Sequence, residues 1–169
     1  MSEELYDDGF RNQINVDFSS VAIKQMQERY QSNVGMQCML IVLICLYECV
    51  VKTMDIREMD FPDSTFGAVL DKGTMDSILC AEGSLMLAAK CLSEISRVLE
   101  PNGVFVCMSH GHPNIRMQVF DKPEYGWRVS VHNVAKPMLK FMKPATNEEE
   151  ENEENSFHYV YVCQCENNM

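Results

Sequence analysis

The sequence predicts an α/β fold in which a mostly parallel sheet carries helices on both faces. Short hydrophobic runs typical of buried strands alternate with segments of helical period. Toward the C-terminus, two stretches alternate between apolar and polar residues, which indicates an antiparallel hairpin. A chain of 169 residues can bury one core. We therefore expect a single domain over residues 1–169.

The first half of the chain opens with a short strand and a helix. Residues 13–18 have strand character, and Ser19 and Ser20 after them are favoured helix N-caps. The expected helix then places apolar residues four positions apart, at Ala22, Met26 and Tyr30.

Residues 38–51 form a long run in which every position except Glu48 is apolar. A spanning helix needs about 20 apolar residues, so membrane association is not expected. A buried strand or a core helix is the first interpretation, and a segment outside any stable fold is another.

The second half alternates strands and helices more clearly. A helix over 82–99 has an apolar stripe at Leu85, Ala88, Leu92, Ile95 and Leu99, and Pro101 and Gly103 end it. The other expected elements are a strand end at 52–56, a turn at 61–65, and strands at 66–71, 103–109, 127–134 and 157–165.

Charge is concentrated in one segment. The net charge is −11, and Glu148–Glu154 supplies six of the negative charges, which leaves −5 for the rest. A chain without clustered Lys and Arg is not expected to bind nucleic acid. We expect 144–156 to be a flexible acidic loop, which is either a solvated hairpin tip or a segment that steers a basic protein substrate.

The eight cysteines favour a reducing compartment, and we expect a cytoplasmic protein. Most lie within apolar runs and none forms a CxxC pair, so they are interpreted as buried free thiols. Cys163 and Cys165, like His110 and His112, are two residues apart, but a metal site needs more ligands. No metal is expected.

Three acids stand where apolar strands end, at Asp17, Asp55 and Asp71. In parallel sheets, ligands bind beyond the carboxyl ends of the strands, and an acid after the second strand often binds ribose hydroxyls. The alternative for each acid is a helix cap or a turn.

Three blocks carry a resemblance to a known family: NVDFSSVAIKQMQERY, MDIREMDFPDSTFGAVLDKGTMDSIL and EISRVLEPNGVFVCMSHG. They resemble successive blocks of class I S-adenosylmethionine-dependent methyltransferases. They are most similar to small methyltransferase-like proteins related to the lysine methyltransferases of translation elongation factor 1-alpha. The resemblance covers residues 3–37 and 52–165, and it implies a Rossmann-like fold with S-adenosylmethionine as cofactor.

The resemblance assigns the adenosine side of a cofactor site. Asp17 matches the acid that binds the ribose, and Phe18 lies beside it against the adenosine. Asp55 and Ile56 match the pair around the adenine.

The same resemblance places the block around Lys72 at the cofactor edge. Lys72 matches a lysine near the methionine end of the cofactor, with Asp71 and Gly73 on either side. The alternative is that Lys72 is a structural ion-pair partner of Asp71 or Asp76. Methyl transfer relies on proximity and orientation, so no catalytic residue is assigned.

Two departures from the family pattern stand out. The family has a first strand and a glycine-rich turn of the kind GCGNS, whereas this chain begins within the helix that follows that turn, so it resembles an N-terminally truncated form without the glycine-rich motif. The run 38–51 resembles an insertion. It either lengthens the strand ending at Asp55, adds a helix, or fills the place of the absent strand; an aberrant gene product is a further interpretation of both departures.

The predicted function is S-adenosylmethionine-dependent methylation of a protein lysine, with a translation elongation factor as a candidate substrate. The alternative is a catalytically impaired module of the same fold that binds a partner. A nicotinamide-dependent oxidoreductase is a weaker third interpretation, because the chain has no GxGxxG motif.

Overall fold

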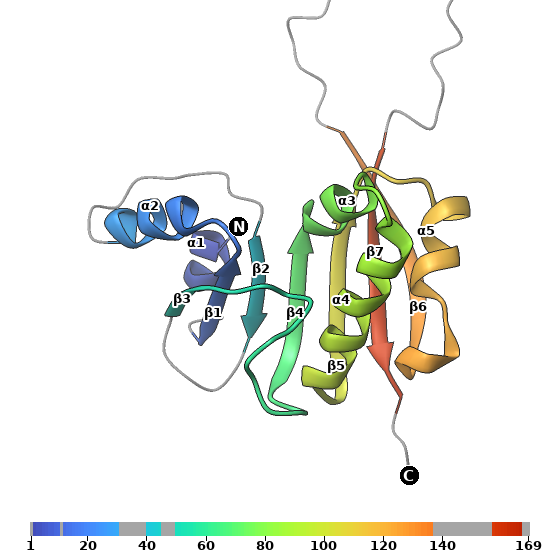
Figure 1. Cartoon of the computed structure of the whole chain (residues 1–169), viewed down its shortest axis with the longest axis horizontal. Coiled ribbons are helices and arrows are strands. Elements are labelled where there is room, and N and C mark those ends of the chain that lie inside the picture. The colour runs from blue at the N-terminus through green and yellow to red at the C-terminus, as the bar shows by residue number, and fades with distance from the viewer. Residues whose placement is uncertain (1, 11, 31–39, 45–49, 137–156, 167–169) are drawn as a thin grey trace, which may run out of the picture.

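The computed structural model describes residues 2–10, 12–30, 40–44, 50–136 and 157–166. Its centre is a seven-stranded sheet in the order β3-β1-β2-β4-β5-β7-β6, shown in Figure 1. The strands are β1 (Gln13–Asp17), β2 (Leu40–Ile44), β3 (Val50–Thr53), β4 (Phe66–Lys72), β5 (Leu99–Ser109), β6 (Trp127–Ala135) and β7 (Phe157–Cys165).

Five strands run in one direction, and β2 and β7 run in the other. β1 pairs with β3 in parallel, and so does β4 with β5, whereas β2 is antiparallel to both β1 and β4. β7 is antiparallel to β5 and to β6. The α/β class and the C-terminal antiparallel hairpin are therefore confirmed. Because β2 runs against its two neighbours, the sheet is mixed rather than parallel between β1 and β4.

The apolar run contributes an interior strand, the third of the seven in the order of the sheet. β2 pairs Ile41 with Val16 of β1 on one side and with Asp71 of β4 on the other. The structure agrees with the interpretation in which the run fills a strand position in the sheet, since β2 lies between β1 and β4. The last two residues of the run begin β3. Residues 38, 39 and 45–49 lie outside the described residues, as does the acidic segment 144–156.

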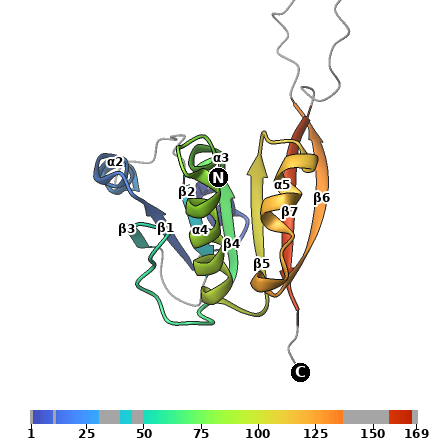
Figure 2. The same ribbon diagram turned by 45° about the vertical axis from the view of Figure 1, so that its right-hand side comes forward.

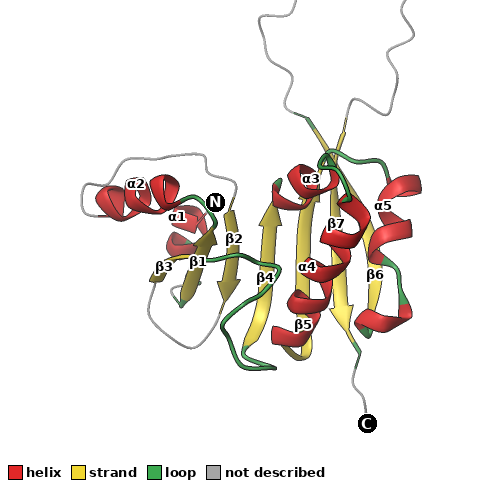
Figure 3. Cartoon of the chain, viewed as in Figure 1, coloured by secondary structure: helices red, strands yellow, loops and turns green. Residues whose placement is uncertain are grey.

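Helices cover the two faces of the sheet unequally. α3 (Thr74–Leu79), α4 (Ser84–Val98) and α5 (Pro113–Phe120) lie side by side on one face, as Figures 1 and 3 show. α1 (Ser2–Asp7) lies behind the sheet in Figure 2, on the opposite face, and α2 (Ser20–Tyr30) packs near β1 and β3. Among the described helices, none combines the length and the apolar character needed to cross a membrane.

The main core lies between α4, α5 and the sheet. α4 buries the residues Ala88, Cys91, Leu92, Ile95 and Val98. The predicted stripe is wrong at both ends: Leu85 is 69% exposed, and Leu99 belongs to β5. Fully buried aromatic rings fill the space toward α5, where Phe105 and Phe120 pack edge to face at 6.2 Å and Phe120 packs against Tyr161 at 5.0 Å.

Three further expectations need correction. The strand expected to end at 52–56 ends at Thr53, so Asp55 and Ile56 lie in the turn that follows. Cys80 is exposed, although Cys91, Cys107 and Cys163 are buried thiols as expected. α3 and α5 were not predicted, because each is too short to show a clear helical period.

Candidate cofactor site

The carboxyl ends of β1, β3 and β4 meet at one edge of the sheet. Asp17, the last residue of β1, pairs with Thr53, the last residue of β3. On the other side of β1, β2 begins with Leu40, which pairs with Lys72 at the end of β4. Two strand spacings therefore separate Asp17 from Lys72, which is about 10 Å.

Asp17 is a buried acid with one oxygen available to a ligand. It is 8% exposed, and its Oδ1 accepts a hydrogen bond from the backbone of Ser19 at 2.8 Å. Among the described residues, none donates to Oδ2. Ser19 in turn caps α2 by accepting from the backbone of Ala22, while Phe18 is 76% exposed. The residue after this incompletely bonded carboxylate thus exposes an aromatic ring.

Asp55 lies close to Asp17 but is bound by a neighbouring arginine. The backbone of Met54 donates to the carbonyl of Asp17 at 3.0 Å, which holds the two segments together. Arg57 donates to both oxygens of Asp55, with Nη2 at 2.6 Å from Oδ2, and its backbone donates to Oδ1 at 2.9 Å. These hydrogen bonds lower the pKa of Asp55. Ile56 is buried, with 7% exposure, in the hydrophobic core.

The loop that carries Asp55 is fastened to α4 by one arginine. Arg97 donates from Nη2 to the carbonyl of Met59 at 2.9 Å and from Nη1 to the carbonyl of Phe61 at 2.7 Å. It also donates to Asp63 and to both oxygens of Glu94 at 2.8 Å. Glu94 accepts from the backbone of Met59 at 2.7 Å. The sequence analysis did not identify these two residues.

Asp71 turns the chain from β4 into α3. Its side chain is fully buried and accepts from the backbones of Thr74 at 2.9 Å and Met75 at 3.0 Å, and from the Cys107 thiol at 3.3 Å. Burial raises the pKa of Asp71 against the effect of these hydrogen bonds. Gly73 has a φ of 87°, in the left-handed region that glycine adopts without strain. Asp71 therefore belongs to the turn and the helix cap.

Lys72 points away from Asp71. Successive residues of a strand face opposite sides of the sheet, and Lys72 is exposed on the side of α1, where its charge acts on Glu4. The alternative that Lys72 pairs with Asp71 or Asp76 is wrong, because Asp71 is bonded as described above and Asp76 forms its ion pair with Arg116 at 2.9 Å.

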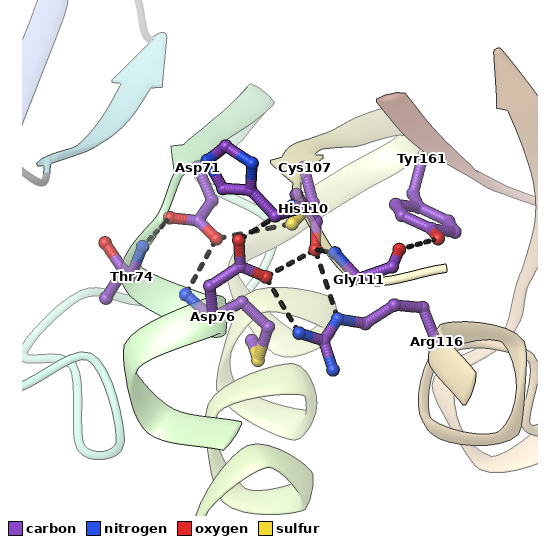
Figure 4. A network of polar contacts seen from close by, with 10 residues as sticks. Asp71, Thr74, Asp76, Cys107, His110, Gly111, Arg116 and Tyr161 are labelled. Atoms are coloured by element: carbon purple, nitrogen blue, oxygen red, sulfur yellow. Dashed lines mark hydrogen bonds and ion pairs between the residues drawn. The ribbon is translucent and has the colours of Figure 1, made fainter. Parts of the chain in front are cut away.

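A polar network joins the ends of β4 and β5, as shown in Figure 4. Asp76 of α3 accepts from the Ser109 hydroxyl and from Nη2 of Arg116, and Arg116 Nε donates to Ser109 at 3.1 Å. Gly111 donates its backbone N–H to Ser109 at 3.0 Å and accepts from the Tyr161 hydroxyl at 2.6 Å. A β-carbon at Gly111 would collide with the guanidinium of Arg116. The network therefore fixes the turn after β5.

This turn brings histidines together, a result that the sequence did not predict. The backbone of His110 donates to Asp76 at 2.9 Å, and its ring packs edge to face against His158 of β7 at 4.8 Å. His112 caps α5, since its Nδ1 accepts from the backbone of Asn114 at 3.2 Å, and its ring packs against Tyr159. The only sequence signal was the SHGHP stretch after a buried strand.

The groups at this edge fit an adenosyl amino acid in their chemistry. Asp17 offers an acceptor for ribose hydroxyls, Phe18 offers a ring face, and Lys72 offers a cation for a carboxylate. Asp55 fits less well, because Arg57 already occupies both of its oxygens. Two hollows on the described surface lie elsewhere, one along α2 and one between α4 and α5.

Comparisons of sequence and structure identify the family. Residues 1–107 match the model of a methyltransferase domain. The chain is 37% identical over 138 residues to the human eEF1A lysine and N-terminal methyltransferase, a match that covers 80% of this chain and 18% of that protein. It is 33% identical over 135 residues to the mouse EEF1A lysine methyltransferase 4, covering 75% of this chain and 48% of that protein.

Solved structures share the fold. The putative methyltransferase in complex with the Haloferax volcanii Trm112 activator superposes with a TM-score of 0.62 at 14% identity, covering 92% of this chain and 72% of that chain. The PH0226 protein from Pyrococcus horikoshii OT3 has a TM-score of 0.56 at 19% identity, covering 98% and 76%. The chain spans less than half the length of the two relatives above. Since the family model covers more than half of the chain, the protein belongs to the methyltransferase-domain family.

Proposed function

We propose that the chain binds S-adenosylmethionine at the edge formed by β1, β3 and β4 and takes part in methylating a protein lysine. Family membership implies this cofactor. The observation that carries the proposal is Asp17, a buried acid with an available oxygen, beside an exposed aromatic ring and about 10 Å from a lysine on the same edge.

Each residue of the proposed site has a defined task. Asp17 accepts hydrogen bonds from the ribose, and Phe18 covers the adenosine. Asp55 borders the adenine, with Ile56 packed beneath the turn. Lys72 lies toward the amino-acid end, and Asp71 and Gly73 shape the turn that presents it.

The bound cofactor would supply an electrophilic methyl group on a sulfonium, and the protein would supply orientation. A lysine substrate is proposed because both relatives are named for lysine methylation of eEF1A. Elongation factor 1A is therefore the first substrate to test. Since these relatives are named as methyltransferases, the comparisons favour an enzyme over a partner-binding module.

Titration with S-adenosylhomocysteine by calorimetry tests the site. We expect Asp17→Asn to weaken binding about tenfold or more, since a charged hydrogen-bond acceptor contributes about 1.5–3 kcal/mol. Asp55→Asn should have a smaller effect, because Arg57 already holds that carboxylate.

Glu124→Gln is the matched control, because it removes one exposed negative charge beyond α5 at the opposite end of the sheet. A folded wild-type protein that shows no binding at millimolar ligand would refute the proposal, as would equal affinities for wild type and Asp17→Asn.

A further inference from the structure

The carboxylate of Asp55 lies at the base end of the proposed site, but its acceptor positions are already occupied. The backbone N–H and the Nε of Arg57 both donate to Oδ1 at 2.9 Å. Nε is also 3.0 Å from Oδ2, and Nη2 donates to Oδ2 at 2.6 Å. A carboxylate has about four acceptor positions. Each oxygen of Asp55 therefore already accepts two hydrogen bonds, and no position is free for a ligand.

The turn after β3 keeps the two residues within reach of each other. The hydrogen bond from the backbone of Arg57 to Oδ1 of Asp55 closes a turn between residues two apart. The backbone of Glu58 donates to the carbonyl of Asp55 at 3.2 Å and tightens the same turn. Ile56, between the two partners, is 7% exposed and packs in the hydrophobic core. A buried side chain thus anchors the turn that carries the pair.

The pair is also favourable electrostatically. Hydrogen bonds from Arg57 lower the pKa of Asp55, and Asp55 raises the pKa of Arg57. Both side chains are 46% exposed, so solvent weakens part of the attraction. The planar guanidinium nevertheless matches a carboxylate with parallel hydrogen bonds, whereas a ligand amine offers it one N–H at a time. A ligand must therefore open the pair before Asp55 can accept from it.

This occupied carboxylate lies where the base of a bound adenosyl group would lie. Asp17, which would hold the ribose, pairs with Thr53 in the parallel ladder of β1 and β3. Asp55 follows Thr53 by two residues, and the backbone of Met54 between them donates to the carbonyl of Asp17 at 3.0 Å. A base joined to a ribose at Asp17 would therefore meet Asp55 together with Arg57.

We propose that Arg57 determines the specificity of the base position: by occupying Asp55, it removes the acceptor for the 6-amino group of adenine. This inference rests on the proposed function and deepens it. An amine gains a bond to Asp55 only by displacing Arg57, and the cost of opening the pair offsets that gain. A carbonyl oxygen at C6 needs a donor instead, and the guanidinium has further N–H groups besides those that Asp55 accepts. The site should therefore accept a purine with either group at C6.

The test compares two ligands that differ at C6 of the purine. S-adenosylhomocysteine carries the 6-amino group, and S-inosylhomocysteine carries a carbonyl in its place. Both are titrated into the folded protein by calorimetry in the same buffer. We expect the dissociation constants of the wild type to agree within about threefold, because neither group gains a net hydrogen bond to Asp55.

Variants assign the lack of discrimination to Arg57. Arg57→Met removes the guanidinium and frees Asp55, so the preference for S-adenosylhomocysteine should rise about fivefold or more. Adding Asp55→Ala to Arg57→Met removes the freed acceptor and should abolish the gained preference. Arg128→Met is the matched control, because the Arg128 side chain is 82% exposed and pairs with Glu166, away from the proposed site. The ratio of the two affinities should be unchanged in this control.

The outcomes separate this inference from the proposed function. If the wild type prefers S-adenosylhomocysteine by more than threefold, or if Arg57→Met raises the preference less than fivefold, the role of Arg57 is wrong and the adenosine site stands. If the wild type binds neither ligand at millimolar concentration, the proposed function is wrong as well. Should Arg57→Met fail to fold, Arg57→Lys replaces it: an ammonium cannot reproduce the planar fork, so part of the preference should appear. An unchanged ratio in Arg57→Lys would then refute the inference.

Discussion

Asp71 and Lys72 are adjacent in the sequence and opposite in charge, yet they have separate tasks. Asp71 is fully buried and holds the first turn of α3, while Lys72 is exposed on the other face. The alternation of side chains along a strand produces this separation. The charged residues that follow the apolar end of β4 thus serve both the fold and the proposed site.

Replacing Asp71 by Ala should cost about 2–3 kcal/mol of unfolding free energy, because the buried N–H groups of Thr74 and Met75 lose their acceptor. Urea unfolding followed by circular dichroism measures this change. Asp60→Ala is the control, since the Asp60 side chain is 97% exposed and its removal should cost less than about 0.5 kcal/mol.

The loss in Asp71→Ala should also depend on pH in a defined direction. Folding raises the pKa of Asp71. The contribution of this group to the free energy of unfolding is therefore complete below the ordinary aspartate pKa, and it falls as the pH rises through the pKa in the folded state. The difference between wild type and variant should therefore be larger at pH 4 than at pH 7. A difference that grows toward pH 7 would contradict the assigned direction.

At the scale of elements, α4 both packs the core and holds the loop after β3. Its buried stripe lies against the sheet. Glu94 accepts a hydrogen bond from the backbone of Met59, and Arg97 donates to the carbonyls of Met59 and Phe61. The loop holds Asp55 beside Asp17, so the geometry of the proposed adenosine site depends on this helix.

Arg97→Met should destabilise the protein by about 2–4 kcal/mol, because the carbonyls of Met59 and Phe61 lose a charged donor. The rate of backbone amide hydrogen exchange should increase most at residues 59–65 and less in the strands. Arg97→Lys should recover only part of the loss, since an ammonium cannot reproduce the planar fork.

Arg128→Met is the control for this experiment, because the Arg128 side chain is 82% exposed and pairs with Glu166. Equal losses of protection across the whole chain in Arg97→Met would argue against a local clamp.

At the scale of the whole molecule, β2 joins two halves of the sheet. β3 and β1 stand on one side, and β4, β5, β7 and β6 on the other. β2 bonds to both halves through its backbone, so the ends of β1 and β4 keep their spacing only if this strand is in place.

Native-state hydrogen exchange tests this arrangement. The amides of residues 41–43 should exchange much more slowly than those of the edge strand β3, because β2 is paired on both sides. Exchange of residues 41–43 within seconds, while β4 and β5 stay protected, would show that β2 is not part of the sheet.

The sequence by itself determined the elements whose signals are local. The end of the helix ahead of Pro101, the alternation in β7 and the apolar character of β4 and β5 depend on neighbouring residues and required no knowledge of distant ones. The acids at the ends of β1 and β4 could be recognised for the same reason, and so could the resemblance of the blocks around them.

Only the tertiary structure decided which groups meet. The hydrogen bond of Arg97 to Met59 and the contact of His110 with His158 join residues 38 and 48 positions apart. The direction of β2 depends on its pairing with strands from different parts of the chain. Such contacts arise from the packing of complete elements, and no local pattern encodes them. For the same reason, the sequence could place Asp71 beside Lys72 but could not show that Asp71 caps a helix while Lys72 faces the other side of the sheet.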